Sequence, residues 1–227
     1  RRSARAGAGR GCSPVIARLS KIAAALAALA YPALARAQTS SGGWAFGGWG
    51  GVLHDEPAMA IFATGAIGAT AVRSEATLRE DNEGEMTVRA TLGLDRFFTP
   101  GRKDLSLIAE LQYDGLGADD ASHLLEVASS KSFMRGELQT LGTWTAVMQA
   151  SYQIHALVGL SAMALVNLTD GSTLVAPGLS WSATGSTSVR LGVYSGLGQA
   201  GLLPLGTLAS EYGSIPGLAY VAISRFF

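Results

Sequence analysis

Two short stretches of this sequence hold residue types that could bind a ligand. Residues 196–201 match GxGxxG, the glycine pattern that cradles dinucleotide phosphates when a strand precedes it and a helix follows. Here the motif opens a Gly- and Leu-rich connection to another predicted strand, so we interpret it as a loop. Residues 114–120 cluster three aspartates that could bind calcium, but their spacing lacks the full ligand set, which favours a solvated acidic loop.

The three histidines do not form a convincing site. His123 follows the acidic loop, but one loop that holds both the aspartates and the histidine is little support for acid–base catalysis, and we interpret His123 as a surface residue. His54 and His155 have no metal-ligand partner at useful spacing. We therefore expect no metal, no cofactor and no enzymatic activity.

Four charged side chains on the polar faces of predicted strands are the best site candidates. They are Arg89, Asp95, Glu110 and Arg190. In the expected pairing of 85–98 with 104–113, Arg89 lies opposite Gln112 or Asp114 and diagonal to Glu110. Two interpretations stay open. The charges line a pore and select solutes, or they form a salt-bridge network that fills a narrow interior.

Alternating hydrophobicity is the main structural signal in the elements that carry these charges. In 85–98 the even positions are mostly apolar and the odd positions polar, and 105–113 continues this pattern after the turn at 99–103. The apolar faces are longer than those of typical soluble strands. Charges on the other face would be costly in a dry core but are tolerable in a wet or networked interior. These features favour strands that cross a bilayer.

Eight such strands predict an all-β fold, an antiparallel transmembrane β-barrel over residues 59–227. The expected strands are 59–72, 85–98, 105–113, 138–153, 158–168, 173–182, 187–195 and 217–227. The connections 99–103, 154–157 and 183–186 are short, whereas 73–84, 114–137 and 196–216 are long; 169–172 is a short exception. Short turns at one end and long loops at the other are typical of outer-membrane barrels.

The N-terminal residues have a different composition. Residues 1–37 hold seven of the 17 basic side chains and no acid, so residues 38–227 carry a net charge of −7. The apolar stretch 22–34 and the small residues at 35 and 37 predict a signal peptide over 15–37, cleaved before Gln38. We expect 1–14 to be a non-native upstream extension and 38–58 a periplasmic segment. Trp44–Leu53 resembles a further strand, which would break the even strand count.

The C-terminal residues carry a family resemblance. The sequence ends in an aromatic residue, Phe227, and Ile223, Val221 and Ala219 are apolar at alternating positions before it. This ending resembles the last strand of Gram-negative outer-membrane β-barrels; Arg225 departs from the pattern. The resemblance implies that the assembly machinery reads Phe227, Ile223 and Val221 as a signal. Residues 110–115 and 167–172 are also similar to strand-to-loop junctions of porin-like barrels.

The resemblance implies a location in the cell outer membrane and a porin-like function, the passive passage of small hydrophilic solutes. The expected partners are outer-membrane lipid, lipopolysaccharide and the barrel-assembly machinery, with no nucleic acid. The alternative is a non-transporting structural or surface-interaction barrel with acidic extracellular loops. Eight strands leave little interior space, so the chain would be either a shortened member of a larger family or a complete small barrel.

Overall fold

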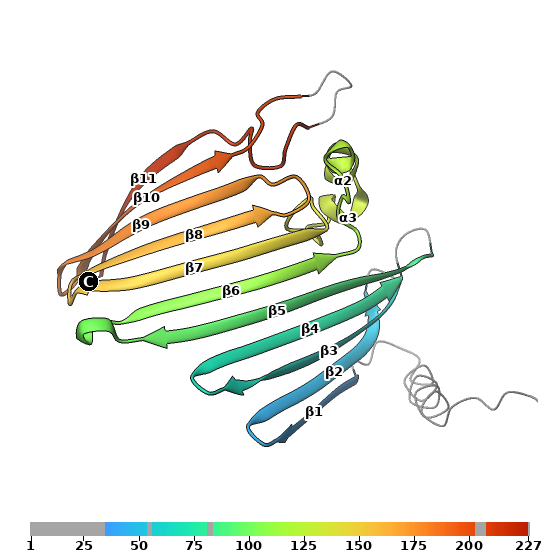
Figure 1. The fold of residues 1–227 in the computed structure, drawn as a ribbon, viewed down its shortest axis with the longest axis horizontal. Helices are drawn as coiled ribbons and strands as arrows, with labels where there is room; N and C mark the ends of the chain where they lie inside the picture. Colours follow the sequence, from blue (N-terminus) through green and yellow to red (C-terminus); the bar gives the residue numbers. More distant parts are fainter. Residues whose placement is uncertain (1–34, 54–55, 81–83, 203–207, 227) are drawn as a thin grey trace, which may run out of the picture.

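The computed structural model describes residues 35–53, 56–80, 84–202 and 208–226, and it is all-β. Eleven strands form one sheet, in which each strand pairs antiparallel with the next along the chain (Figure 1). The strands are β1 (Ala35–Ser41), β2 (Trp44–Leu53), β3 (Glu56–Ile67), β4 (Thr70–Glu80), β5 (Met86–Phe98), β6 (Leu105–Asp114), β7 (Trp144–His155), β8 (Val158–Asn167), β9 (Thr173–Thr184), β10 (Thr187–Leu197) and β11 (Leu218–Arg225). The short helices are η1 (Pro100–Arg102), η2 (Ala121–His123), α2 (Leu124–Ala128) and α3 (Lys131–Met134).

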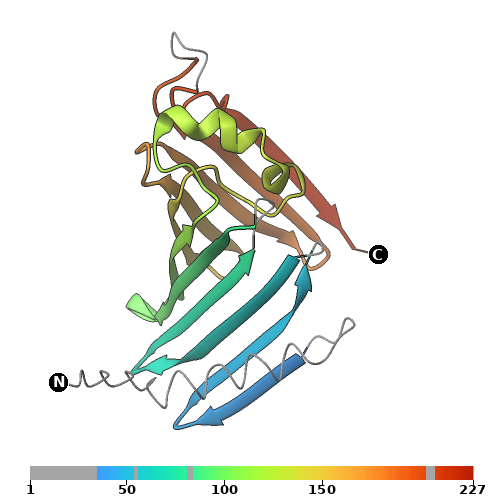
Figure 2. The same ribbon diagram turned by 90° about the vertical axis from the view of Figure 1, so that its right-hand side faces the viewer.

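The sheet curls into an open trough rather than a closed cylinder (Figure 2). β1 and β11 form the two edges of the described sheet. Because every neighbouring pair is antiparallel, these two odd-numbered edge strands run in the same direction. The sheet is therefore the antiparallel meander that the alternation predicts, but barrel closure is not part of the described structure.

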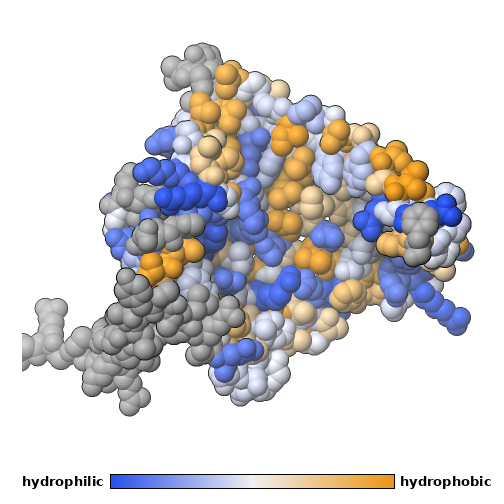
Figure 3. Space-filling view, turned by 180° about the vertical axis from the view of Figure 1, so that it is seen from behind, coloured by the Kyte–Doolittle hydropathy of each residue, from blue (hydrophilic) through white to orange (hydrophobic). Residues whose placement is uncertain are grey.

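The two faces of the sheet differ in chemistry. We call the convex side of the curled sheet the outer face and its concave side the inner face (Figure 2). In β5, Leu92 and Leu94 alternate with the inner-face residues and are 47% and 43% exposed. Thr91 and the buried Gly93 lie on the concave side, the inner face. Figure 3 looks into this hollow, where hydrophilic residues lie beside apolar ones. The strand period of two thus separates an apolar outer face from a largely polar inner face.

The prediction of eight strands is wrong, and part of the error lies around Gly68. The hydrophobic pattern predicts one strand over 59–72 and a long loop over 73–84. The chain instead reverses after Ile67, where Gly68 has a positive φ of 60°, and β4 then pairs with both β3 and β5. The alternating charges of β4 are strand residues on the inner face, although their polarity made the segment look like a loop.

Two further strands lie in the range predicted to be a periplasmic N-terminal segment. β1 and β2 form a hairpin at Gly42 and Gly43, whose positive φ values suit a two-residue turn. β2 is the possible extra strand at Trp44–Leu53, and β3 completes its pairing. Residues 1–34, which hold the predicted upstream extension and most of the predicted signal peptide, lie outside the described residues; residues 35–37 begin β1.

The connections partly follow the prediction. The two longest, 115–143 and 198–217, lie at the same end of the sheet, and the short turns 156–157 and 185–186 lie at the other end (Figure 1). β7 begins at Trp144 rather than at 138, because residues 139–143 belong to the long connection. Within the described ranges, no helix combines the length and the hydropathy that a membrane crossing requires.

Candidate functional site

The inner face of β4, β5 and β6 concentrates the charged residues. Strand register brings them together, because Arg73 pairs with Gly93, which pairs with Glu110 on the next strand. Two inner-face positions further along β5, Arg89 lies opposite Asp114. Side chains at directly paired positions lie within contact distance across neighbouring strands. Residues that are far apart in sequence therefore form one charged surface.

The first charge cluster surrounds Gly93. The Arg73 guanidinium donates to Asp95 Oδ1 at 3.1 Å. A Cβ atom at Gly93 would lie 3.4 Å from Arg73 Nε and Nη2 and 3.7 Å from Glu110 Oε2, so both side chains lie close over this glycine. Gln112 Nε2 donates to Glu110 Oε1 at 2.5 Å. The cluster thus gathers one cation and two carboxylates around Gly93.

The second cluster ties the long connection 115–143 to the inner face. Arg79 Nη2 donates to Glu137 Oε2 at 2.6 Å, and both side chains are nearly buried. Arg89 Nη2 donates to the Glu137 carbonyl oxygen at 2.5 Å, while its Nε donates to Asp114 Oδ2 at 2.7 Å. Two arginines from β4 and β5 therefore hold Glu137 over the inner face. The Arg79–Glu137 pair is largely shielded from water, whereas the Arg89 side chain is 41% exposed.

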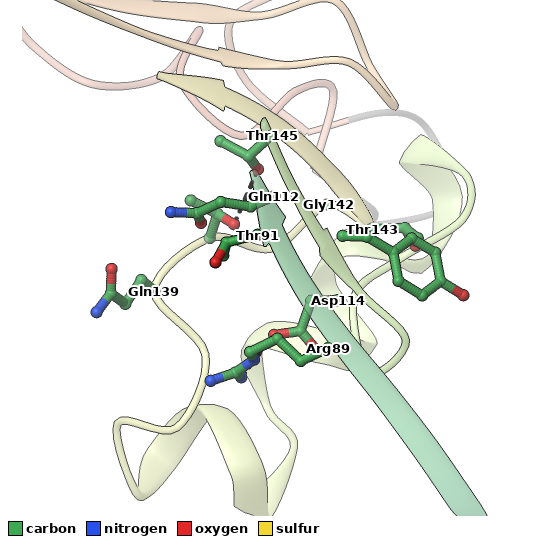
Figure 4. Close-up of a pocket in the computed structure, with 10 residues that line it drawn as sticks. Arg89, Thr91, Gln112, Asp114, Gln139, Gly142, Thr143 and Thr145 are labelled. Atoms are coloured by element: carbon green, nitrogen blue, oxygen red, sulfur yellow. Dashed lines mark hydrogen bonds and ion pairs between the residues drawn. The ribbon is translucent and has the colours of Figure 1, made fainter. Parts of the chain in front are cut away.

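A polar pocket of about 170 Å³ lies beside the second cluster. Figure 4 shows that its residues come from β5, β6, the start of β7 and the end of the long connection. Its lining is rich in hydroxyl and amide groups, from Thr91, Gln112, Gln139, Thr140 and Thr145. Such groups both donate and accept hydrogen bonds, which suits water or a hydroxylated solute.

A buried polar cluster locks the second long connection, 198–217, against the same end of the sheet. Glu211 accepts hydrogen bonds from the Leu141 amide at 3.0 Å and from Asn167 Nδ2 at 2.7 Å. The Glu211 amide donates to Asp170 Oδ2 at 2.6 Å, and the Tyr212 amide donates to Ser172 Oγ at 3.2 Å. One acidic residue therefore joins three connections of the sheet.

Burial raises the pKa values of both side chains at the centre of this cluster. The pKa of Glu211 lies above its ordinary value of 4.5 because burial disfavours the carboxylate, although the hydrogen bonds from Leu141 and Asn167 oppose the shift. Burial also raises the pKa of Tyr212, with the Glu211 charge acting in the same direction. The carboxylate is held in a site that penalises its charge.

The acidic loop forms a local exposed pair rather than an ion site. His123 Nδ1 lies 2.8 Å from Asp119 Oδ1, and both side chains are largely exposed. This hydrogen bond raises the pKa of His123 and lowers that of Asp119. Asp120 accepts from the Ser122 amide, and Asp114 pairs with Arg89. Among the described residues, no group of three His, Cys, Asp or Glu side chains is placed to hold a metal.

The structure brings together three of the four predicted site residues. Arg89, Asp95 and Glu110 share the inner face of β5 and β6. Arg190 lies exposed on β10, opposite Ser180 and Ala222, with β7, β8 and β9 between it and the cluster.

The predicted assembly residues are on the outer face of β11. Val221 and Ile223 are 67% and 72% exposed, at the alternating positions that the sequence indicates. Phe227 lies outside the described residues. The local pattern therefore placed these two apolar side chains on the correct face of their strand.

Sequence reasoning missed four residues that matter in this arrangement. Arg73 and Arg79 alternate with polar neighbours at strand period, a signal that was available but was interpreted as a loop. Glu137 and Glu211 lie in long connections without periodicity, so no local pattern could place them.

No protein-family model, curated protein sequence or solved structure matches this chain.

Proposed function

We propose that this chain forms the wall of a porin-like β-barrel in the cell outer membrane, which lets small hydrophilic solutes pass passively along its inner face. The supporting observation is that a single sheet carries an exposed apolar outer face and a charged inner face. An apolar surface of this extent is unfavourable in water but matches hydrocarbon. Most strands are also about as long as a tilted strand needs to be to cross a bilayer, which fits the same environment.

The inner face suggests how solutes would be selected. Arg73 pairs with Asp95 and lies close to Glu110 over Gly93, and the pocket beside Arg89 offers hydroxyl and amide groups. Charged rings and hydrogen-bonding groups at a constriction are the usual basis of solute selection in pores. Glu137, held by Arg79 and Arg89, would narrow the passage at the end with the long connections.

The second candidate is a non-transporting structural or surface-interaction barrel. The contacts of Glu137 with Arg79 and Arg89 favour it, because they hold the connection 115–143 over the inner face, where it could fill the interior instead of narrowing it. The long connections 115–143 and 198–217 would then form an outward surface. Both candidates predict outer-membrane lipid, lipopolysaccharide and the barrel-assembly machinery as partners.

Conductance measurements separate the two candidates. The protein expressed from this sequence should fractionate with the outer membrane and migrate differently on gels before and after boiling. In planar bilayers it should give steady ohmic current steps. Glu137→Gln should enlarge the steps by loosening the connection, while Arg225→Gln, on the outer face of β11, should leave them unchanged.

Two outcomes would contradict the proposal. Recovery in the soluble periplasm would exclude a membrane barrel. A folded, heat-modifiable protein without current steps, both as wild type and as Glu137→Gln, would exclude passage and favour the second candidate.

A further inference from the structure

A separate groove lies on the outer face, across β5 to β9. Its volume is about 720 Å³, within the range of ligand sites. Alanines at positions 109, 150, 162 and 164 form its floor, because their short side chains leave the sheet uncovered. The walls include Leu94, Phe98, Leu107 and Met148. The groove is therefore shaped for an apolar ligand of elongated form.

One cation lies in the lining of this groove. Arg96 is the outward-pointing residue between Leu94 and Phe98, and its guanidinium carbon lies 4.9 Å from the centre of the Phe98 ring. This cation–π contact holds the side chain beside the groove. Within the described part of the chain, no carboxylate lies within ion-pair distance of Arg96. An exposed guanidinium of this kind is well suited to a phosphate.

We propose that this groove and Arg96 bind one anionic phospholipid, with an acyl chain lying over the alanine floor and the phosphate on the guanidinium. The inference rests on the proposed function in one respect, namely that the outer face meets lipid. It goes further by assigning a specific site, at the end of the sheet with the short turns, rather than a general annulus.

The position of Arg96 along the strand supports a lipid headgroup. β5 ends at Phe98, two residues beyond Arg96, and Tyr152 and Trp181 lie at the same end of the outer face. Aromatic side chains of this kind are enriched where a barrel meets lipid headgroups. The guanidinium is thus at headgroup depth, while the alanine floor extends toward the hydrocarbon.

Native mass spectrometry of the detergent-solubilised protein tests the site. Phosphatidylglycerol, added after delipidation, should leave one lipid bound per chain. Arg96→Gln should weaken retention roughly tenfold, about the value of one charge-assisted hydrogen bond. Ala162→Leu should also weaken it, by filling the groove. Arg225→Gln and Ala146→Leu, which change an arginine and an alanine of the outer face outside the groove, are the matched controls.

Several outcomes would overturn the site. The lipid site is excluded if the Arg96→Gln and Ala162→Leu variants fold, as judged by heat-modifiable migration, and still retain as much lipid as the wild-type protein. If inorganic phosphate binds as tightly as the lipid, the acyl chain has no role. A dimer that forms without lipid would assign the groove to a second copy of the chain. Conductance measured on the same samples separates the two proposals. Lipid retention without current contradicts only the pore. Current without lipid retention contradicts only the lipid site.

Discussion

At the scale of single residues, the face on which a side chain lies decides which substitutions the protein tolerates. Leu92 and Thr91 are neighbours in β5 but point to opposite sides of the sheet. Leu92 pairs with Leu111 on the outer face, whereas Thr91 lies opposite Glu75 and Gln112 on the inner face. In the proposed membrane location, the same new charge would therefore meet hydrocarbon at one position and polar groups at the other.

Leu92→Arg should lower the free energy of unfolding by roughly 2–4 kcal/mol, the cost of an arginine near the middle of a lipid-facing strand. Thr91→Arg should cost less, because Glu75 and Gln112 offer partners. Urea unfolding in lipid vesicles measures both values, and equal costs would mean that the two faces are assigned to the wrong environments.

The terminal residue tests the resemblance to outer-membrane barrels. Deleting Phe227 should reduce outer-membrane levels in cells far more than refolding yield in detergent, because burial of one terminal side chain is worth at most about 1.5–3 kcal/mol. Phe226 would become the terminal aromatic, but with Ser224, Ala222 and Tyr220 at the alternating positions. Deleting both Phe226 and Phe227 should lower outer-membrane levels more than deleting Phe227 alone. Normal membrane levels after the double deletion would rule out an assembly signal.

At the scale of elements, the two long connections differ in how they are held. Arg79 and Arg89 hold 115–143 through charges, and β-strand residues supply the cations. Glu211 holds 198–217 through a carboxylate that burial destabilises. The second contact therefore depends on pH through the Glu211 carboxylate, whereas two arginine side chains form the first.

Acid should strengthen the docking of 198–217. The pKa of Glu211 is higher in the docked state than when the loop is free, so the docked state binds the proton more tightly. The resulting stabilisation is complete below the free value of 4.5 and is lost as pH rises through the higher docked pKa. Hydrogen-exchange protection factors of the Leu141 and Tyr212 amides should therefore fall as pH increases from about 4.5.

Glu211→Gln is the control for this pH dependence. An amide at this position can still accept a hydrogen bond from Leu141 but cannot ionise, so protection should become independent of pH in the same window. Wild-type protection that stays constant, or that rises with pH, would contradict the assigned role of Glu211.

At the scale of the whole molecule, the two edges of the described sheet provide a test of the proposed barrel. β1 and β11 run in the same direction, so direct closure would require one parallel pair in an otherwise antiparallel barrel. The proposed passage needs a continuous wall, because an unpaired strand edge is not tolerated in hydrocarbon. The proposal therefore requires that β1 and β11 come together in one chain.

Cysteines on the two edges should crosslink within one chain. Gln38 lies on the inner face of β1, and Tyr220, Ala222 and Ser224 lie on the inner face of β11. With Cys12 replaced by serine, Gln38→Cys should form a disulfide with one of the three positions changed to cysteine in turn. Arg190→Cys with Ala222→Cys, which pair in the sheet, is the positive control.

Gel migration under non-reducing conditions reads the result. A crosslinked monomer supports closure of the sheet on itself. Crosslinks found only between two chains would show that the wall is completed by another copy, and the single-chain barrel would be wrong.

The sequence by itself determined the all-β class and the facing of the regular strands. Alternation over β5, β6, β8, β9 and β10 was strong enough to place Leu92 outward and Arg89 inward, because the strand period of two depends only on local geometry. It failed for β4, because charged residues are also usual residues of loops, and it left the glycine-rich β2 as a possible extra strand.

Only the tertiary structure decided the strand count, the contacts that hold the long connections and the partners of the charges. The reversal at Gly68 depends on β4 finding both neighbours, and the placement of Glu137 and Glu211 depends on arginine and amide donors from distant segments. Such contacts follow from register and from chain closure over long separations, which no local period encodes.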